Sequence, residues 1–247
     1  MSNLRGKNNY SKIIESDQFL SKIYDETYKT FYEIAKRYGF SNAKALEIGA
    51  GDFSLSHKYF ENVKKSDINA SQEAQTTEYI NSEFLPFEDE SFDCVLAKDA
   101  LHHFKNPYAS LLEVHRVLKP SGVFIVCEPY WSLSGRFIFK FIHPEDWNAS
   151  PSTLELKSSN PWDSNQALLY LLNGKFKSEL ADHVPGFNLK ILNSGYGLVY
   201  AVSGGVFSRT KIPAVILLVL HKLEKKCIKP LKRIIGLNIF AVFEKEF

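Results

Sequence analysis

Three residues in the middle of the chain have side-chain types used for proton transfer: His102, His103 and Glu128. Histidine changes charge near neutral pH, and a carboxyl group in a closed cleft can have its pKa raised towards the same range. These residues follow two short apolar runs, Cys94–Ala97 and Val123–Cys127, which have the length of buried strands. Because ligands of open α/β sheets bind beyond the carboxyl ends of the strands, we expect all three side chains to face a site. The alternative is that one histidine only anchors the helix that follows.

A second group of residues forms a glycine turn suited to a ligand of nucleotide size. The apolar segment Ala43–Ile48 predicts a short covered strand, after which Gly49 and Gly51 let the backbone turn sharply and approach a ligand closely. Glu47, near the end of that strand, can face a positive group such as an ammonium, where a pyrophosphate would be repelled. Ser54 stands where a dinucleotide fingerprint would have its third glycine. A nicotinamide dehydrogenase is therefore disfavoured.

Asp67 is the candidate for binding a ribose. It ends the predicted strand Val63–Asp67 and follows Gly49 at close to the roughly 20-residue spacing at which an acidic side chain reaches ribose hydroxyls. A carboxylate can accept hydrogen bonds from both hydroxyls of the sugar. The alternative is that Asp67 caps a helix at Ala70–Thr77.

The elements that must position these groups follow from the apolar periodicity of the chain. Helical spacing predicts a lead-in over Ser11–Phe40, whose tyrosines either close over a ligand or pack on the sheet edge. Asp52 and Ser54 can cap a helix after the glycine turn. Besides the strands already given, we expect a helix over Leu55–Phe60 and another over Asn106–Leu118. Later in the chain we expect a strand over Phe187–Asn193, one or two basic helices over Ile212–Gly236, and a last strand over Leu237–Glu244.

Four short motifs occur in one order and spacing: Leu85-Pro86-Phe87, Ser91-Phe92-Asp93, Leu101-His102-His103 and Arg116-Val117-Leu118-Lys119-Pro120. Together with the acidic-x-Gly-x-Gly turn, they resemble the class I S-adenosylmethionine-dependent methyltransferases over roughly residues 43 to 130. The resemblance implies an α/β fold with a Rossmann-like, doubly wound, mostly parallel seven-strand sheet. It also implies S-adenosyl-L-methionine as the cofactor and makes His102, His103 and Glu128 candidate catalytic residues.

The same resemblance implies a set of cofactor contacts. In the family an aspartate at the position of Asn81 accepts from the adenine amino group, and the amide oxygen of Asn81 can accept such a bond. The full set of expected cofactor-binding residues is Glu47, Gly49, Ala50, Gly51, Asp67, Ile68, Asn81, Ser82, Glu83 and Lys98. Phe53 and Asn81 depart from the family pattern, which leaves open a non-catalytic module that binds the cofactor as a sensor or scaffold.

At 247 residues, the chain has the length of one α/β domain with an elaboration. We divide this expected single domain into a helical cap (1–42), a cofactor-binding core (43–128), an aromatic and basic acceptor-side insertion or lid (129–186), and the C-terminal strands with a basic helix (187–247). Within the insertion, His143, Asp146 and Trp147 can contact an acceptor, but a turn after a helix explains these residues equally well. The Ser-, Pro- and Asn-rich loop that follows has the length of a lid.

Composition indicates the compartment and excludes some partners. The cysteines Cys94, Cys127 and Cys227 have no paired spacing, and the N-terminus has no apolar signal core, so we expect a cytoplasmic protein. The formal net charge of +2 and the absence of a basic stripe with stacking aromatics argue against nucleic-acid binding. No His or Cys pair with further partners has metal-ligand spacing, so we expect no metal site.

The C-terminal third is the basic part of the chain. Residues 212–233 join an apolar run to a series of lysines, which suits a helix lying on the inner face of an anionic membrane. A solvated charged face is the alternative. The sequence therefore predicts a methyltransferase for a small-molecule, lipid-linked or glycan-linked acceptor, with oxygen as the expected acceptor atom and no obligate protein partner.

Overall fold

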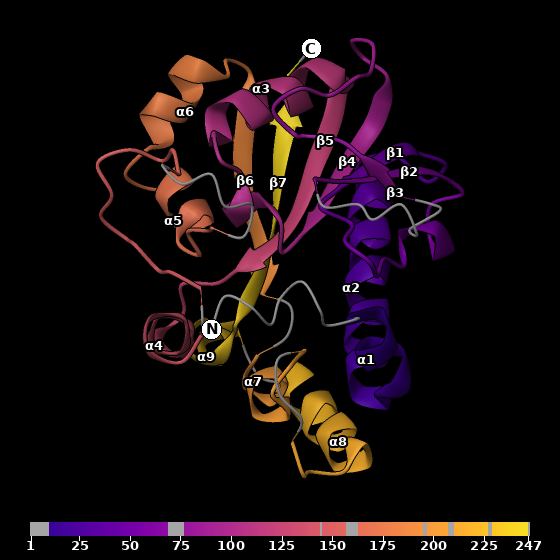
Figure 1. Ribbon diagram of the computed structural model, residues 1–247, viewed down its shortest axis with the longest axis vertical. Helices are drawn as coiled ribbons and strands as arrows, with labels where there is room; N and C mark the ends of the chain where they lie inside the picture. The colour runs from indigo at the N-terminus through magenta and orange to yellow at the C-terminus, as the bar shows by residue number, and fades with distance from the viewer. Residues whose placement is uncertain are drawn as a thin grey trace.

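A single twisted sheet forms the centre of the molecule (Figure 1). The computed structural model describes residues 10–68, 77–143, 145–156, 163–194, 197–206, 210–226 and 229–246. In this part of the chain, seven strands pair in the order β3-β2-β1-β4-β5-β7-β6. Neighbours from β3 to β5 are parallel, and β7 runs antiparallel to both β5 and β6. The strands are β1 (Lys44–Ile48), β2 (Asn62–Asp67), β3 (Thr77–Tyr79), β4 (Phe92–Lys98), β5 (Leu118–Pro129), β6 (Phe187–Ser194) and β7 (Asn238–Lys245). The predicted mostly parallel, seven-strand α/β sheet is confirmed.

Helices cover both faces of the sheet, which explains why its central strands are continuously apolar. On one face, Leu46 and Val95 pack in a cluster with α3 (Pro107–Val117), α5 (Leu168–Leu172) and α6 (Lys177–His183). On the other face, Ala45 and Leu96 pack against α2 (Gln18–Arg37). Successive residues of a strand point to opposite faces, so each strand contributes to both clusters.

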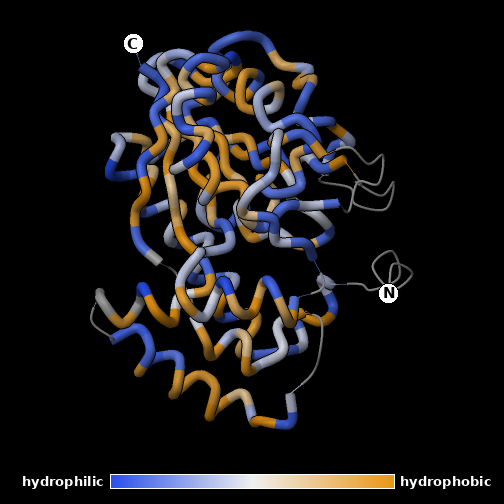
Figure 2. Tube along the Cα trace, turned by 90° about the vertical axis from the view of Figure 1, so that its left-hand side faces the viewer, coloured by the Kyte–Doolittle hydropathy of each residue, from blue (hydrophilic) through white to orange (hydrophobic). Residues whose placement is uncertain are grey.

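A group of short helices lies beyond the carboxyl ends of the parallel strands, at the lower end of Figure 1. They are α1 (Tyr10–Ser16), α4 (Leu133–Phe141), α7 (Leu198–Ser203), α8 (Ala214–Lys225) and α9 (Lys229–Ile235). Leu217 of α8 packs with Ile14 of α1 and Phe19 of α2, so α8 rests on the two N-terminal helices. Figure 2 shows α8 at the foot of the molecule with apolar residues along it. None of the described helices is long and apolar enough to cross a membrane.

Several expected elements differ from the structure. The expected helix over Leu55–Phe60 is wrong: only the 3-10 turn η1 (Ser56–Lys58) forms. The Ser54 hydroxyl donates to Glu47 and accepts from the Ser56 N–H at 3.1 Å, and the residue that precedes η1 is Leu55, whose side chain cannot cap a helix. The basic segment forms two helices, α8 and α9. The helix considered at Ala70–Thr77 lies outside the described residues, except for Thr77, which begins β3.

Candidate active site

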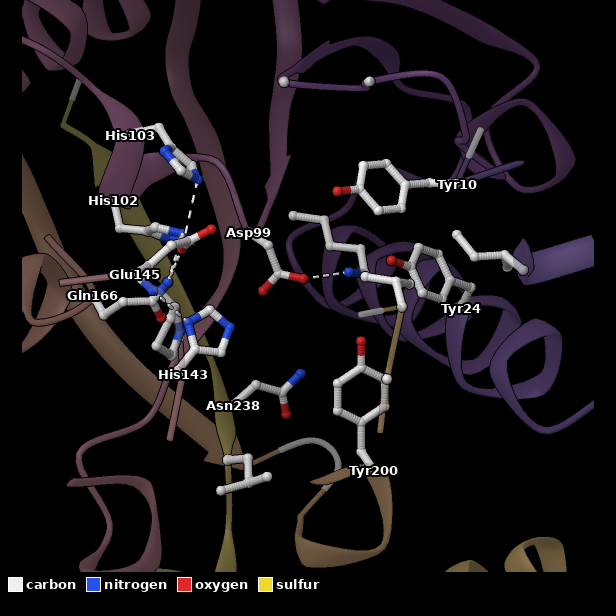
Figure 3. Close-up of a pocket in the computed structure, with 18 of the residues that line it drawn as sticks. Tyr10, Tyr24, Asp99, His102, His103, His143, Glu145, Gln166, Tyr200 and Asn238 are labelled. Atoms are coloured by element: carbon white, nitrogen blue, oxygen red, sulfur yellow. Dashed lines mark hydrogen bonds and ion pairs between the residues drawn. The ribbon is translucent and has the colours of Figure 1, made fainter. Parts of the chain in front are cut away.

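A cavity of about 470 Å³ opens beyond the carboxyl ends of β1, β4 and β5. One side is formed by the glycine turn (Gly49–Phe53) with Lys98 and Asp99. The other side is formed by a group of polar side chains that we call the histidine cluster: His102, His103, His143, Glu145 and Gln166. Figure 3 shows the histidine cluster on the left, Tyr10 and Tyr24 on the right, and Asp99 between them. The cavity thus has two chemically different ends.

The glycine turn requires glycine for two reasons. Gly49 and Gly51 have φ values of +73° and +58°, which side-chain-bearing residues rarely adopt. A Cβ atom at Gly49 would also lie 2.3 Å from the Cβ of Ala100, well inside van der Waals contact. The backbone N–H groups of Gly49 and Ala50 donate to the carbonyl of Ser66 on β2, at 2.9 and 3.0 Å. The turn is therefore fixed in a shape that leaves room for a ligand.

Glu47 lies beneath this turn and is almost fully buried. The Tyr28 hydroxyl donates to Glu47 Oε1 at 2.6 Å, and the Ser54 hydroxyl donates to Glu47 Oε2. Burial and the neighbouring carboxylate raise the pKa of Tyr28 well above its usual range, so the phenol keeps the proton that it donates. The sequence left open whether the N-terminal tyrosines close over a ligand or pack on the sheet. Tyr28 is a buried core residue that also lines the cavity.

The residues expected around the adenosine half divide into two groups. Asp67 Oδ2 accepts from the Gly51 N–H at 2.9 Å, so β2 brings this carboxylate to the glycine turn as predicted. Asn81 and Glu83 instead make local bonds. Asn81 Oδ1 accepts from the N–H of Glu83 at 3.0 Å, and Glu83 Oε1 accepts from the N–H of Asn106 at 3.1 Å.

Ser82 shares a hydrogen bond with Ser110 at 2.9 Å, and Ile68 is exposed. Asp67, Ile68 and residues 81–83 all lie outside the lining of the cavity, near the carboxyl ends of β2 and β3. Their predicted contacts with the adenosine half therefore stay predictions.

Lys98 and Asp99 form an ion pair at the end of β4. The Lys98 ammonium also lies 4.1 Å from the centre of the Tyr24 ring. Asp99 has a φ of +50°, a strained conformation for a residue with a side chain, and its N–H donates to the Cys127 carbonyl at 2.9 Å. Asp99 and Tyr24 were absent from the predicted cofactor set. Asp99 could have been found from its place directly after a buried strand.

His102 is held between two carboxylates. Its Nδ1 lies 2.6 Å from Glu128 Oε2, and its Nε2 lies 3.3 Å from Glu145 Oε2. Burial of the ring opposes its charge and lowers its pKa, but the charges and hydrogen bonds of the two carboxylates outweigh this and raise the pKa of His102 to about 10. Burial would also raise the pKa of Glu145, but the hydrogen bond and charge of His102 hold it well below its usual range.

Glu128, expected as a candidate base, is fully buried behind His102 and does not line the cavity. One carboxylate oxygen accepts from the N–H groups of Ala100 and Leu101, at 3.0 and 2.8 Å. The other oxygen accepts from His102, which sits in the 3-10 turn η2 (Leu101–His103). These contacts correct the expectation: Glu128 orients the histidine turn and does not contact a ligand in the cavity.

His103 is the more accessible histidine of the pair, with 23% of its side chain exposed. Its Nδ1 lies 3.2 Å from the carbonyl oxygen of Asp163, and its Nε2 lies 3.8 Å from Glu145 Oε2. The N–H of Glu145 donates to His143 Nδ1 at 3.3 Å. Glu145 was missed from the sequence, although it lies between His143 and Asp146, which were considered.

Residues 46–126 match the sequence profile of a protein family described as a methyltransferase domain. The arginine-hydroxylase NDUFAF5, mitochondrial, of Danio rerio is 31% identical over 106 residues, which cover 38% of this chain and 32% of that protein. The ubiquinone/menaquinone biosynthesis C-methyltransferase UbiE of Hahella chejuensis is 34% identical over 87 residues, which cover 35% of this chain and 30% of that protein. The matches thus span about a third of the length of these curated relatives.

The fold is also found among solved structures. An S-adenosylmethionine-dependent methyltransferase from Archaeoglobus fulgidus superposes with a TM-score of 0.51 at 18% identity. The superposition covers 89% of this chain and 94% of the other. At this identity the likeness establishes the fold, and the sequence match over 46–126 contains the glycine turn and both histidines of η2.

Proposed function

We propose that this chain, which belongs to the class I S-adenosylmethionine-dependent methyltransferase family, transfers a methyl group to a hydroxyl oxygen of a small-molecule, lipid-linked or glycan-linked acceptor. The observation that carries the proposal is that the glycine turn and the histidine cluster line one cavity. A cofactor at the turn and an acceptor at the histidine cluster would share that cavity, and together they would keep water out of the space between them. Such alignment supplies much of the rate of a displacement reaction.

The residues of the turn fit the cofactor, S-adenosyl-L-methionine. Gly49, Ala50 and Gly51 line the cavity directly, and Asp67 lies within hydrogen-bond distance of the Gly51 N–H, where ribose hydroxyls would approach. Lys98 and Asp99 place opposite charges at the cavity, which suits the carboxylate and ammonium of an amino-acid group. The cofactor supplies an activated methyl group and its own leaving group, so the chain has to bind, orient and exclude water.

On the acceptor side, we assign the catalytic role to His102 and His103, with Glu128 as the residue that positions them. The histidine cluster places imidazole nitrogens and the Glu145 carboxylate at one end of the cavity. His103, the more exposed ring, is suited to removing a proton from a hydroxyl group, whereas His102, held protonated between Glu128 and Glu145, is suited to donating a hydrogen bond to the acceptor. This pairing supports oxygen as the acceptor atom. The relative UbiE is named a C-methyltransferase, so carbon is the alternative acceptor atom for this chain.

The lower helices support an acceptor at a membrane. Exposed apolar side chains project from α4 and α8, and we call this set, with its nearby cations, the apolar-basic surface: Leu133, Phe137, Phe141, Ile142, Val215, Ile216, Val219, Leu220 and Leu223, with Arg136, Lys140, Lys222 and Lys226. Its positive charge is complementary to anionic lipid head groups. We propose that the chain contacts an anionic membrane peripherally through this surface, and that it works in the cytoplasm as a single domain without nucleic acid or an obligate protein partner.

The proposal is tested by measuring cofactor binding and turnover separately. S-adenosylhomocysteine binding is measured by calorimetry, and the purified protein is incubated with S-adenosylmethionine carrying a ¹³C methyl group together with a lipid and metabolite extract. We expect binding, and at least one extract component that gains a labelled methyl group in a mass spectrum. Heat-treated protein is the control.

Two outcomes contradict the proposal. A protein that binds no cofactor lacks the site altogether. A protein that binds the cofactor but labels no component of an extract from cells that lack this protein is the sensor or scaffold module. Phe53, which departs from the family pattern and packs against Tyr24 in the cavity lining, is the reason to test that alternative.

A further inference from the structure

Three atoms of metal-binding type converge at the acceptor end of the cavity. His102 Nε2 and His103 Nε2 lie 3.3 and 3.8 Å from the same atom, Glu145 Oε2. One donor atom from each of the three residues lies within 4.8 Å of the others, the one such His, Cys, Asp or Glu group found in the described part of the chain. In Figure 3 these side chains lie together on one side of the cavity. Separations of this size are compatible with a shared cation at about 2 Å from each donor.

The opposite nitrogen of each histidine faces an acceptor. His102 Nδ1 faces Glu128 Oε2 at 2.6 Å, and His103 Nδ1 faces the backbone carbonyl of Asp163 at 3.2 Å. In both rings Nε2 is the nitrogen directed at Glu145. A metal that binds there displaces any proton on Nε2, and the proton on Nδ1 stays with its acceptor. Metal-ligating histidines show this arrangement, in which a carboxylate or carbonyl fixes the tautomer and the ring orientation. These partners make Nε2 the nitrogen available for coordination. The Gln166 amide now lies 3.3 Å from His102 Nε2 and donates to Glu145 Oε2, so a metal ion would displace it from these two atoms.

We propose that His102, His103 and Glu145 bind one divalent transition-metal ion at the acceptor end of the cavity. Two imidazole nitrogens and one carboxylate favour zinc, iron, cobalt, nickel or manganese over magnesium and calcium, which prefer oxygen ligands. Three protein ligands leave a coordination position open, as in catalytic metal sites. Because all three residues line the cavity, that position is accessible to a ligand bound there.

The use of the metal rests on the proposed methyl transfer, whereas its binding does not. With the metal bound, His102 and His103 act as its ligands and not as bases. Coordination of the acceptor hydroxyl lowers its pKa, and its proton leaves to water. The oxygen electron pair then forms the new O–CH₃ bond as the C–S bond breaks, and the electrons of that bond return to sulfur, giving the neutral thioether. The metal keeps its charge throughout.

The binding is tested on the full chain after treatment with a chelator and dialysis. We expect calorimetric titration to show one Zn²⁺ ion per chain, and Co²⁺ to give visible absorption bands typical of nitrogen and oxygen ligands, with no competition from Mg²⁺. Loss of a residue that only hydrogen-bonds to a metal ligand weakens metal binding by roughly 10- to 100-fold. Glu145→Gln and His103→Ala remove ligands themselves, so each should weaken Zn²⁺ binding by more than this. His57→Ala and Glu155→Gln, two exposed residues of the same types outside the cluster, should leave the affinity unchanged.

Folding and function are controlled separately. Circular dichroism and S-adenosylhomocysteine affinity establish that the variants retain the fold, and Glu145→Gln is the decisive variant because it preserves the size of the side chain. No Zn²⁺ binding, or binding that survives both Glu145→Gln and His103→Ala in folded protein, overturns the site. Methyl transfer that persists fully in metal-free protein removes the metal from the reaction but leaves the proposed function standing. Zn²⁺ binding without any methyl transfer confirms the site and contradicts the function.

Discussion

Asp67 shows how one side chain can serve both the fold and a ligand. At the end of β2 its Oδ2 accepts from the Gly51 N–H, so the carboxylate helps to hold the glycine turn. A carboxylate has further lone pairs on both oxygens, which leaves capacity for ribose hydroxyls. The residue is only partly buried, so such a ligand can reach it.

We predict that Asp67→Ala weakens S-adenosylhomocysteine binding by roughly 10- to 150-fold, because losing hydrogen bonds to a charged group costs about 1.5 to 3 kcal/mol. Calorimetry measures the affinity directly. Asp182→Ala, an exposed aspartate on α6, is the matched control and should bind as the parent does. If Asp67→Ala binds as tightly as the parent, Asp67 does not contact the ribose.

At the scale of elements, the contact between α2 and α8 ties the two ends of the chain together. Glu26 on α2 accepts from His221 at 3.0 Å and from Lys225 at 2.8 Å, both on α8, and Lys22 lies 3.6 Å away. Glu224 lies 3.8 Å from the other nitrogen of His221. This polar contact lies beside the apolar contact of Leu217 and fixes how α8 lies over the N-terminal helices.

The pKa values of this contact give it a defined pH range. The hydrogen bond from His221, together with Lys225, outweighs burial and lowers the pKa of Glu26 to about 2, so its contribution is present above the ordinary carboxyl pKa of 4.5 and is lost as the pH falls towards 2. Burial opposes charge on His221, but Glu224 and Glu26 raise its pKa, so its contribution is present below 6.5 and is lost as the pH rises through the raised value. The contact is strongest between these limits.

We therefore predict that Glu26→Gln lowers the free energy of unfolding by about 1 to 3 kcal/mol at pH 5.5, and by clearly less at pH 3. Urea unfolding at the two pH values measures both differences. Glu33→Gln, on the same helix but exposed and paired only with Lys36 among the ion pairs found, should cost less than about 0.5 kcal/mol. An equal loss at both pH values for Glu26→Gln would show that the ionised contact with α8 does not stabilise the fold.

At the scale of the whole molecule, the cavity and the apolar-basic surface belong to the same group of elements. Ile138, Phe139 and Ile142 of the α4 segment line the cavity, while Phe137 and Phe141 of the same helix are exposed. On α8, Leu217 and His221 are buried, and Ala214 and Leu218 pack against the same cluster. The exposed apolar residues of the helix are Val215, Ile216, Val219, Leu220 and Leu223. The α4 segment therefore connects the cavity lining with the exposed apolar residues.

We predict that the protein co-sediments with vesicles containing anionic lipid, that salt weakens this binding, and that neutral vesicles bind it less. Each basic side chain near the surface contributes about 1 kcal/mol of attraction, which salt screens. The double change Phe137→Ser and Val219→Ser should reduce binding, whereas Leu112→Ser, at an exposed apolar residue on α3, should not. A protein that stays in the supernatant at low salt has no such membrane contact, and a soluble acceptor is then favoured.

The sequence by itself determined the parts of this protein that depend on local patterns. The glycine turn was predictable because positive φ at Gly49 and Gly51 is a property of those residues alone. The strands β1, β4, β5 and β7 followed from short apolar runs, the helices α1 to α3, α8 and α9 from a period of about 3.6 residues, and Asp67 from its distance along the chain. The Leu101-His102-His103 motif is also local, because its residues are adjacent in the sequence. It therefore predicted that the two histidines follow β4 closely.

Only the tertiary structure decided which distant groups meet. Glu145 and the Asp163 carbonyl reach the histidines from a loop far along the chain, and no periodicity encodes that approach. Glu128 ends its strand as expected, yet three donors from the neighbouring turn hold it behind His102, which its position in the sequence did not show. Likewise, Ser54 donates to Glu47, a partner from the preceding strand, and only a single 3-10 turn forms after it. Each of these outcomes depends on side chains competing for partners in three dimensions, which local pattern does not specify.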